Sequence, residues 1–184
     1  MTAKKYICIT CGTQYPEGQN PPAGCAICQD DRQYVNPNGQ QWTTLEDEAG
    51  KHANTFDEIA PGVTTISTTP KLGIGERAHL LQTPQGNILW DLVPYLDDAT
   101  VAEIRGRNGV AAIAISHPHF YSTMGEWSQA LGDVPIYLHA LNRPWVMNPT
   151  AAIRYWEEDT VEPLPGLTLL RCGGHFPGST VLHW

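Results

Sequence analysis

Two pairs of cysteines near the start of the chain have the spacing of metal ligands. Cys8 and Cys11 are separated by two residues, and so are Cys25 and Cys28. Each Cys-x-x-Cys turn places two thiolates on one side, and two such turns close a tetrahedral cage of four sulfurs. Gly12 follows the first pair and permits the positive φ that turns backbone N–H groups toward sulfur. The spacing predicts a four-cysteine metal site with no coordination position left open for a substrate.

Histidines in two separate motifs mark a candidate second metal site. His117 and His119 follow VAAIAIS (110–116), a continuous apolar run typical of a strand covered on both faces. His175 lies in a glycine-rich turn, GGHFPGST, between two expected strands. Three imidazoles and a water form an open zinc site in which the pKa of the water falls to about 7. The resulting hydroxide would attack an ester, thioester or lactone-type carbonyl.

Asp91 and Tyr121 are candidate catalytic residues beside these histidines. Asp91 closes the apolar stretch ILWDL, where a buried carboxylate without a partner is costly. Tyr121 lies two residues after His119. A phenol has a pKa of about 10 and is a poor base at neutral pH, so Tyr121 would orient substrate or stabilise an oxyanion. The alternatives are that Asp91 caps a turn and that Tyr121 packs in the core.

The elements that must position these residues alternate between strands and helices. Strands are expected at 59–68, 78–83, 87–92, 110–116, 135–139, 167–171 and 179–184. Helices are expected over 97–109, after residue 122, and around 149–157. Thr100 with Glu103, and Thr123 with Glu126, have the spacing of a capping box. The pattern predicts an α/β fold.

Composition divides the chain into three segments. Residues 1–45 carry the four cysteines and little apolar content, so metal binding would supply their folding free energy. Residues 46–55 are polar and are interpreted as a linker. Residues 56–184 hold the strands, the helices and the histidines.

The cysteine segment resembles zinc ribbons and, in CITCGTQY, the first knuckle of rubredoxins. Gln29 follows Cys28 where rubredoxins have glycine, which favours structural zinc over iron. Iron remains the alternative metal, and an electron carrier of the rubredoxin kind the alternative function. Two disulfides are the alternative to a metal site.

Residues 56–184 resemble the metallo-β-lactamase fold superfamily. That family orders its chain as paired strands, a strand ending in aspartate, a helix, a strand ending in His-x-His-x-Asp-His, and a later Gly-His-x-Pro-Gly turn. The resemblance implies an αββα sandwich with His117, His119 and His175 as ligands of the first metal and Asp91 as a supporting residue.

The chain departs from this family at two places. Tyr121 and Ser122 stand where the family has the aspartate and histidine that hold a second metal. The chain also ends at Trp184, so we expect the domain to be incomplete at its C-terminus, with a homo-oligomer covering the exposed sheet. These departures favour a mononuclear zinc hydrolase, and leave a catalytically inactive binding module as the alternative.

Charge and hydropathy exclude several classes of partner. The net charge is −8, the isoelectric point is about 5.2, and lysines and arginines form no cluster larger than a pair. A general nucleic-acid surface needs a concentrated basic face. No run of about 18 apolar residues predicts a membrane span, and the N-terminus has no signal-peptide pattern. We expect a cytoplasmic protein that binds a small-molecule substrate.

Overall fold

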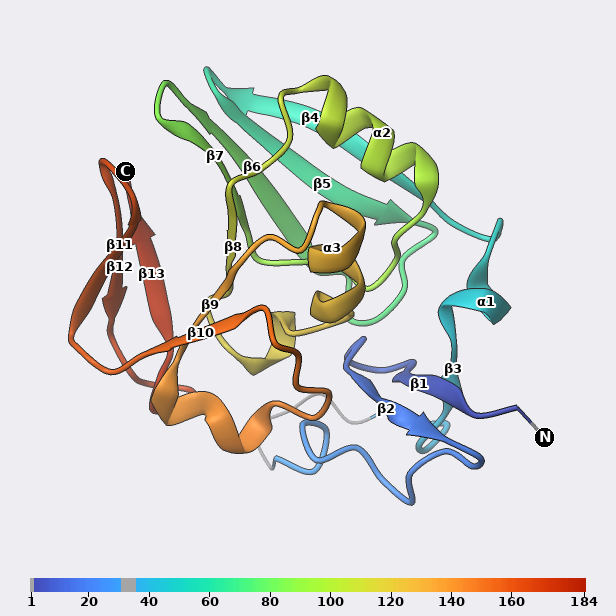
Figure 1. Cartoon of the computed structure of the whole chain (residues 1–184). Helices are drawn as coiled ribbons and strands as arrows, with labels where there is room; N and C mark the ends of the chain where they lie inside the picture. The colour runs from blue at the N-terminus through green and yellow to red at the C-terminus, as the bar shows by residue number, and fades with distance from the viewer. Residues whose placement is uncertain (1, 31–35) are drawn as a thin grey trace.

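A seven-stranded sheet forms the centre of the protein (Figure 1). The computed structural model describes residues 2–30 and 36–184, and the strands of this sheet lie in the order β10-β9-β8-β7-β6-β5-β4. Strands β4 to β7 form an antiparallel meander, whereas β7 to β10 pair in parallel. The strand bounds are Ala53–Ala60 (β4), Val63–Thr69 (β5), Arg77–Thr83 (β6), Gly86–Trp90 (β7), Ala112–Ala114 (β8), Ile136–His139 (β9) and Ile153–Trp156 (β10).

The two faces of this sheet are covered differently. Helices α2 (Asp98–Gly106) and α3 (Met124–Ala130) pack on one face, and a second sheet packs on the other. The second sheet has the order β11-β12-β13, with bounds Thr160–Leu164, Leu167–Arg171 and Thr180–His183. The layers are therefore helix, sheet and sheet. In the described part of the chain no helix covers the outer face of the second sheet, so the fourth layer of the expected αββα sandwich is not seen there.

Alternation along the central strands supplies a core to each face. Leu80 and Leu89 pack with Trp127 of α3 on the helical side. Their chain neighbours Leu81 and Ile88 pack with the second sheet on the opposite side. Successive side chains of a strand point to opposite faces, so continuous apolar runs are what a sheet covered on both sides requires.

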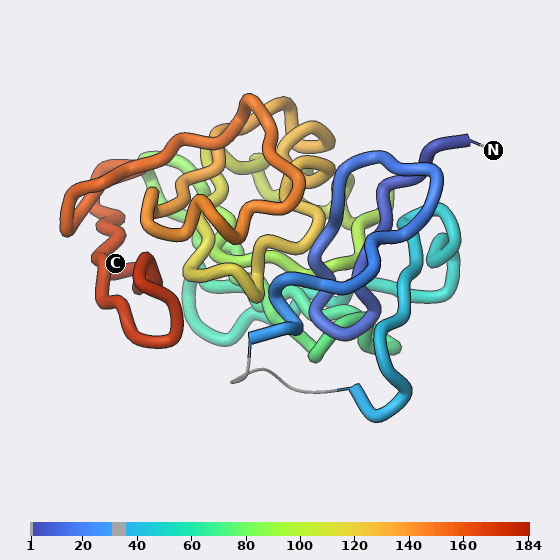
Figure 2. The backbone as a smooth tube through the Cα atoms, turned by 90° about the horizontal axis from the view of Figure 1, so that it is seen from below, coloured from blue at the N-terminus to red at the C-terminus, as the bar shows by residue number. Residues whose placement is uncertain are grey.

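The cysteine segment forms a small unit beside the central domain. Strands β1 (Lys4–Cys8), β2 (Gln14–Gly18) and β3 (Trp42–Thr43) make a three-stranded sheet, and the one-turn helix α1 (Leu45–Glu48) follows. This unit lies against α3 and the chain that follows the 3₁₀ helix η2 (Ala140–Trp145), as seen from two directions in Figures 1 and 2. Residues 31–35, within the range predicted for this unit, lie outside the described residues.

Several predicted elements differ from the structure. The segment expected as a linker, 46–55, contains most of α1 and the start of β4. The single strand expected over 59–68 is wrong, because a turn at Gly62 (φ 76°) separates β4 from β5. The helix expected around 149–157 is also wrong, since β10 pairs there with β9, and β11 was not predicted.

Both predicted capping boxes are replaced by other contacts. Asp97 caps α2, and its side chain accepts a hydrogen bond from the Thr100 N–H. The Thr123 hydroxyl donates to the Pro94 carbonyl instead of capping α3. That hydrogen bond fixes the loop after β7 against the start of α3.

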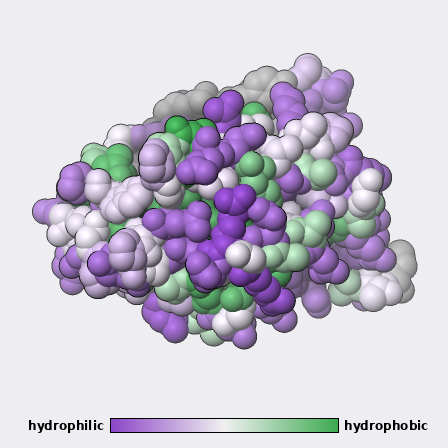
Figure 3. All heavy atoms as spheres, turned by 90° about the horizontal axis from the view of Figure 1, so that it is seen from above, coloured by the Kyte–Doolittle hydropathy of each residue, from purple (hydrophilic) through white to green (hydrophobic). Residues whose placement is uncertain are grey.

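The surface over α2 and the hairpin β4–β5 is mainly hydrophilic, with hydrophobic residues scattered across it (Figure 3). Within the described residues no helix has the length and apolarity needed to span a bilayer.

Candidate metal sites

The parallel strands bring the predicted site residues to one edge of the central sheet. Asp91 directly follows β7, and His117 lies just beyond β8. Since β7 and β8 are parallel, their carboxyl ends meet at the same edge. Asp91 adopts a left-handed backbone (φ 59°), a strained conformation that persists where neighbouring contacts fix it. The Asp91 N–H donates to the Ala114 carbonyl at 2.9 Å and so ties the two strand ends together.

Three imidazoles converge at this edge. His117, His119 and His175 each offer a ring nitrogen, and these nitrogens lie within 4.8 Å of one another. His119 Nδ1 and His175 Nε2 are 3.2 Å apart. Zinc–nitrogen bonds of about 2.0–2.1 Å place two nitrogens of a tetrahedral site about 3.3 Å apart. The residues present therefore fit a metal ion held by three imidazoles.

A hydrogen-bonded relay orients His117. The Asp91 carboxylate accepts from the Ser116 N–H at 2.7 Å and from the Ser116 hydroxyl at 3.0 Å. The same hydroxyl lies 2.9 Å from His117 Nδ1. An ionised carboxylate only accepts, so when Asp91 is charged the Ser116 hydroxyl donates a hydrogen bond to it and accepts one from His117 Nδ1–H. This tautomer leaves the lone pair on His117 Nε2 for a metal.

Burial sets the protonation of these groups. It lowers the pKa of His117 to about 4, and the neighbouring imidazoles of His119 and His175 act in the same direction. At neutral pH His117 is uncharged, the form that binds metal. Burial raises the pKa of Asp91 to about 7, while the N–H and hydroxyl of Ser116 oppose that rise.

The turn that carries His175 is fixed by its own hydrogen bonds and by two neighbours. The Ser179 hydroxyl accepts from the Phe176 N–H, and the Thr180 N–H donates to the Ser116 carbonyl at 3.0 Å. Gly178 N–H donates to the buried side-chain oxygen of Asn142 at 2.8 Å. A Cβ at Gly178 would lie 2.8 Å from Asn142 Cγ, so only glycine permits this close approach.

A second cluster is formed by the four cysteines. Their sulfur atoms lie within 4.8 Å of one another, with 3.6 Å between Cys8 and Cys28 and 3.5 Å between Cys11 and Cys25. Zinc–sulfur bonds of about 2.3 Å give a tetrahedral edge of about 3.8 Å. Gln40 supports the cluster, because its amide donates to Cys8 Sγ at 3.3 Å and accepts from the Cys25 N–H.

The four thiols shift one another's pKa in opposite directions, and the pKa values of Cys11 and Cys28 lie above the ordinary value. The thiols of Cys11, Cys25 and Cys28 lie beside Cys8 and hold its pKa below the ordinary value. None of the four is paired in a disulfide. The four-cysteine cluster expected from the sequence is therefore present, with the ligand chemistry that zinc or iron requires.

Tyr121 does not occupy an open catalytic position. Its side chain is 2% exposed and belongs to the core under the helices. Burial raises the pKa of Tyr121, although the Asn142 amide beside the phenol acts in the opposite direction. Ser122, in a left-handed conformation (φ 48°), accepts at its carbonyl from the Gln14 N–H of the cysteine unit. The geometry supports the packing alternative for Tyr121.

Three residues at the three-histidine site escaped the sequence analysis. Ser116 adjoins His117, and that adjacency was the available signal for a supporting role. Phe176 directly follows His175 in the predicted turn, but that pattern does not show which rings it contacts. Asn142 gave no signal, because its role arises from a tertiary contact. Phe176 is fully buried, and its ring centroid lies 4.5 Å from that of His175 and 5.4 Å from that of His119.

The arrangement of layers and strand ends gives part of the chain a metallo-β-lactamase-like fold. Solved structures support this. The metallo-β-lactamase SMB-1 bound to 2-mercaptoethanesulfonate matches 67% of this chain and 55% of its own, with 21% identity and a TM-score of 0.50. TTHA1623 in a di-iron-bound form matches 61% of this chain and 64% of its own, with 26% identity and a TM-score of 0.51.

Among curated proteins, the chain is similar to the uncharacterized protein YmaE of Bacillus subtilis (strain 168). The two are 46% identical over 181 residues, which cover 97% of this chain. The chain spans 66% of the length of YmaE and 55% to 64% of the two solved structures. No protein-family profile matches the chain.

Proposed function

We propose that the protein is a zinc-dependent hydrolase with a mononuclear site, acting on an ester, thioester or lactone-type carbonyl. The observation that carries this proposal is the convergence of His117, His119 and His175 at the carboxyl edge of parallel strands. A bound zinc ion would supply Lewis acidity and lower the pKa of a water to about 7. The four-cysteine cluster would hold a separate, structural zinc.

The residues around the three histidines orient the ring nitrogens toward a metal ion. His117 presents Nε2 because Ser116 and Asp91 fix its tautomer. His119 Nδ1 and His175 Nε2 already stand at the separation that two ligands of one ion require. Asp91 acts through Ser116 and His117, so it is a positioning residue.

Metal content tests the proposal. Elemental analysis of the purified chain should find two metal equivalents per chain, and His175→Ala should find one. His183→Ala is the matched control, because His183 is exposed on β13, and it should keep two. A content in His175→Ala equal to that of the wild type would overturn the three-histidine site.

Turnover then separates the hydrolase from a catalytically inactive binding module. Hydrolysis of a panel of esters, thioesters and lactones that disappears in His175→Ala supports the enzyme. Two metals per chain without turnover on any of these would support the module. The burial of Tyr121, and the contact of Ser122 with the cysteine unit, are the observations that favour this second candidate.

The same measurement decides between zinc and iron. TTHA1623 has been solved in a di-iron-bound form, and four thiolates accept either metal. Elemental analysis that finds iron at the cysteine cluster, together with visible absorbance, would favour the electron-carrier alternative for that cluster.

A further inference from the structure

Trp145 lies between the two candidate metal clusters. Trp145 and Met147 pack against the buried cysteine cluster. Trp145 also contacts Phe176, with 5.1 Å between ring centroids in an edge-to-face arrangement. In the described part of the chain, Trp145 is the one side chain assigned both to the packing around the cysteines and to the core of the central domain.

Phe176 extends this contact to the histidines. Its ring lies against those of His175 and His119, with centroid distances of 4.5 Å and 5.4 Å. A continuous series of packed side chains therefore runs from the buried cluster that contains the cysteines, through Trp145 and Phe176, to two of the three imidazoles. Close-packed side chains transmit a displacement because the interior leaves little free space.

A backbone contact joins the same two regions. The Gln14 N–H, three residues after Cys11 of the first cysteine knuckle, donates to the Ser122 carbonyl at 3.1 Å. The Gln14 side chain also accepts from Asn148, three residues after Trp145, at 2.9 Å. Ser122 is the strained residue that ends the loop carrying His119, so the cysteine unit stabilises that loop directly.

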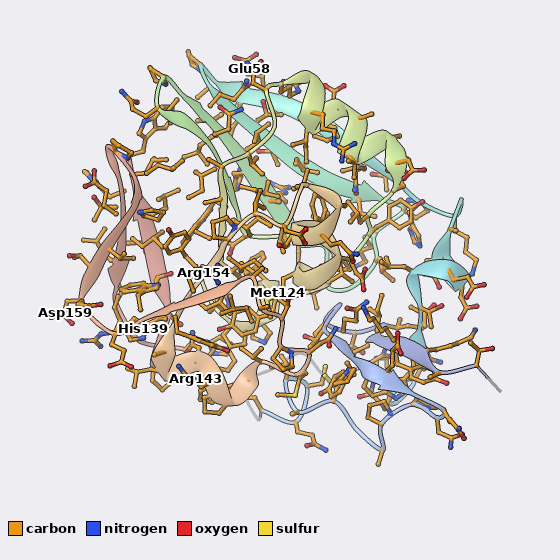
Figure 4. All side chains as sticks on the ribbon, in the orientation of Figure 1. Glu58, Met124, His139, Arg143, Arg154 and Asp159 are labelled. Carbon is orange, nitrogen blue, oxygen red and sulfur yellow. The ribbon has the colours of Figure 1, made fainter. Side chains whose placement is uncertain are left out.

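The packing surface that the cysteine unit offers to Trp145 depends on the cysteine cluster. The segment between the knuckles is rich in turn residues, and without a metal nothing cross-links its four sulfurs. Figures 1 and 4 show the cysteine unit directly beside the chain that follows η2. Arg143, which is labelled in Figure 4, lies on η2 itself.

From these contacts we infer that Trp145 is a positioning residue that couples the two clusters, so that metal in the four-cysteine cluster raises the metal affinity of the three-histidine site. This inference rests on the proposed function only in requiring that the histidines bind metal. A metal-filled cysteine cluster would fix the surface against which Trp145 packs. Trp145 in turn packs against Phe176, and Phe176 packs against His175. Couplings between sites are typically about 5–150-fold in affinity.

Cobalt(II) is the probe that tests this coupling on the full chain. Thiolate-to-cobalt charge-transfer absorption reports the four-cysteine cluster, and weaker visible bands report the three-histidine site, so the two are titrated separately. Cys28→Ser should weaken cobalt binding at the histidines about ten-fold. Trp145→Leu should weaken it by a similar factor and should leave the charge-transfer absorption in place.

The double variant decides whether Trp145 carries the effect. Once Trp145 is replaced, Cys28→Ser should cause a smaller further loss at the histidines than it causes in the wild type, because the Gln14–Ser122 contact still joins the two regions. Trp145→Phe retains an aromatic ring against Phe176 and should restore most of the affinity. Leu141→Ala is the control on the same 3₁₀ helix η2, because Leu141 is exposed, and it should leave both sites unchanged.

Reciprocity gives a second measurement that leaves Trp145 intact. The coupling requires that His175→Ala weaken cobalt binding at the cysteines by the same factor as Cys28→Ser weakens it at the histidines. Equal histidine-site affinities in the wild type, Cys28→Ser and Trp145→Leu would overturn the coupling but leave the proposed function standing. Absence of cobalt from the histidines of the wild type would overturn both.

Discussion

The Asp91 carboxylate holds Ser116 through two hydrogen bonds, of 2.7 Å to its N–H and 3.0 Å to its hydroxyl. This relationship spans two parallel strands and decides which nitrogen of His117 carries the proton. Groups that orient a metal-binding histidine commonly change metal affinity 10–100-fold when they are replaced (about 1–3 kcal/mol).

Asp91→Asn should weaken metal binding at the three histidines by about 10–100-fold. The asparagine amide would donate to the Ser116 hydroxyl, which would then donate to His117 Nδ1. The imidazole proton would move to Nε2 and block the lone pair that faces the metal. Cobalt titration of the visible bands measures the loss, and the charge-transfer absorption of the cysteine cluster should be unchanged.

Asp133→Asn is the matched control for this substitution. Asp133 also has a left-handed backbone (φ 58°), but it lies in the exposed loop after α3. Its replacement should leave both sites unaltered. An Asp91→Asn protein with the metal affinity of the wild type would refute the relay.

The approach of Gly178 to Asn142 gives a second prediction. Gly178→Ala would place a Cβ 2.8 Å from both Cγ and the side-chain oxygen of Asn142. The backbone nitrogen of Asn142 would lie 3.1 Å from the same Cβ. The turn carrying His175 would have to shift, at a cost of about 1–3 kcal/mol in the free energy of unfolding. Urea denaturation should show this loss, and metal content should fall from two equivalents toward one.

Gly106→Ala provides the contrast. Gly106 ends α2, and an added Cβ there meets no atom within 4 Å. Loss of unfolded-state entropy should make this variant more stable by about 0.4–1 kcal/mol, with two metals retained. Equal stability and metal content in the two variants would show that the contact with Asn142 does not position His175.

The sequence predicted the parts of the site that lie in local patterns. Cys-x-x-Cys spacing, the apolar run before His117 and the turn around His175 are contiguous stretches, and the structure brings their side chains together. Ile153 and Trp156 are three residues apart, a spacing that also occurs on one face of a helix. Both are buried in strand β10, because this segment pairs in parallel with β9. The pairing with β9 therefore outweighed the local helical pattern of this segment.

Other features depend on the assembled chain and could not be predicted. Asn142 and Trp145 come from η2, far in sequence from both motifs, and only folding brings them to Gly178 and Phe176. The predicted linker covered only the start of β4, residues 53–55, and the predicted strand began at residue 59. Most side chains of β4 are exposed, with Asn54 and Phe56 alone turned partly inward. The alternation is too weak to distinguish such an edge strand from a loop.

Glu76 gives a prediction for the pH dependence of stability. Its side chain is 6% exposed in the loop before β6, and burial raises its pKa from 4.5 to about 7 against the effect of the N–H groups around it. In the unfolded chain the carboxyl loses its proton near 4.5. Between pH 4.5 and 7 the folded protein therefore holds one more proton than the unfolded chain, so stability falls as the pH rises.

Glu76→Gln should remove this fall. The raised pKa corresponds to a loss of about 3 kcal/mol between pH 4.5 and 7. Urea denaturation at pH 5 and pH 8 should show a smaller change in the variant than in the wild type, with the variant more stable at pH 8. Glu58→Gln, at an exposed position on β4 (Figure 4), should keep the wild-type change. If Glu76→Gln also keeps that change, Glu76 is ionised in the folded protein at pH 5 and its burial does not perturb its titration.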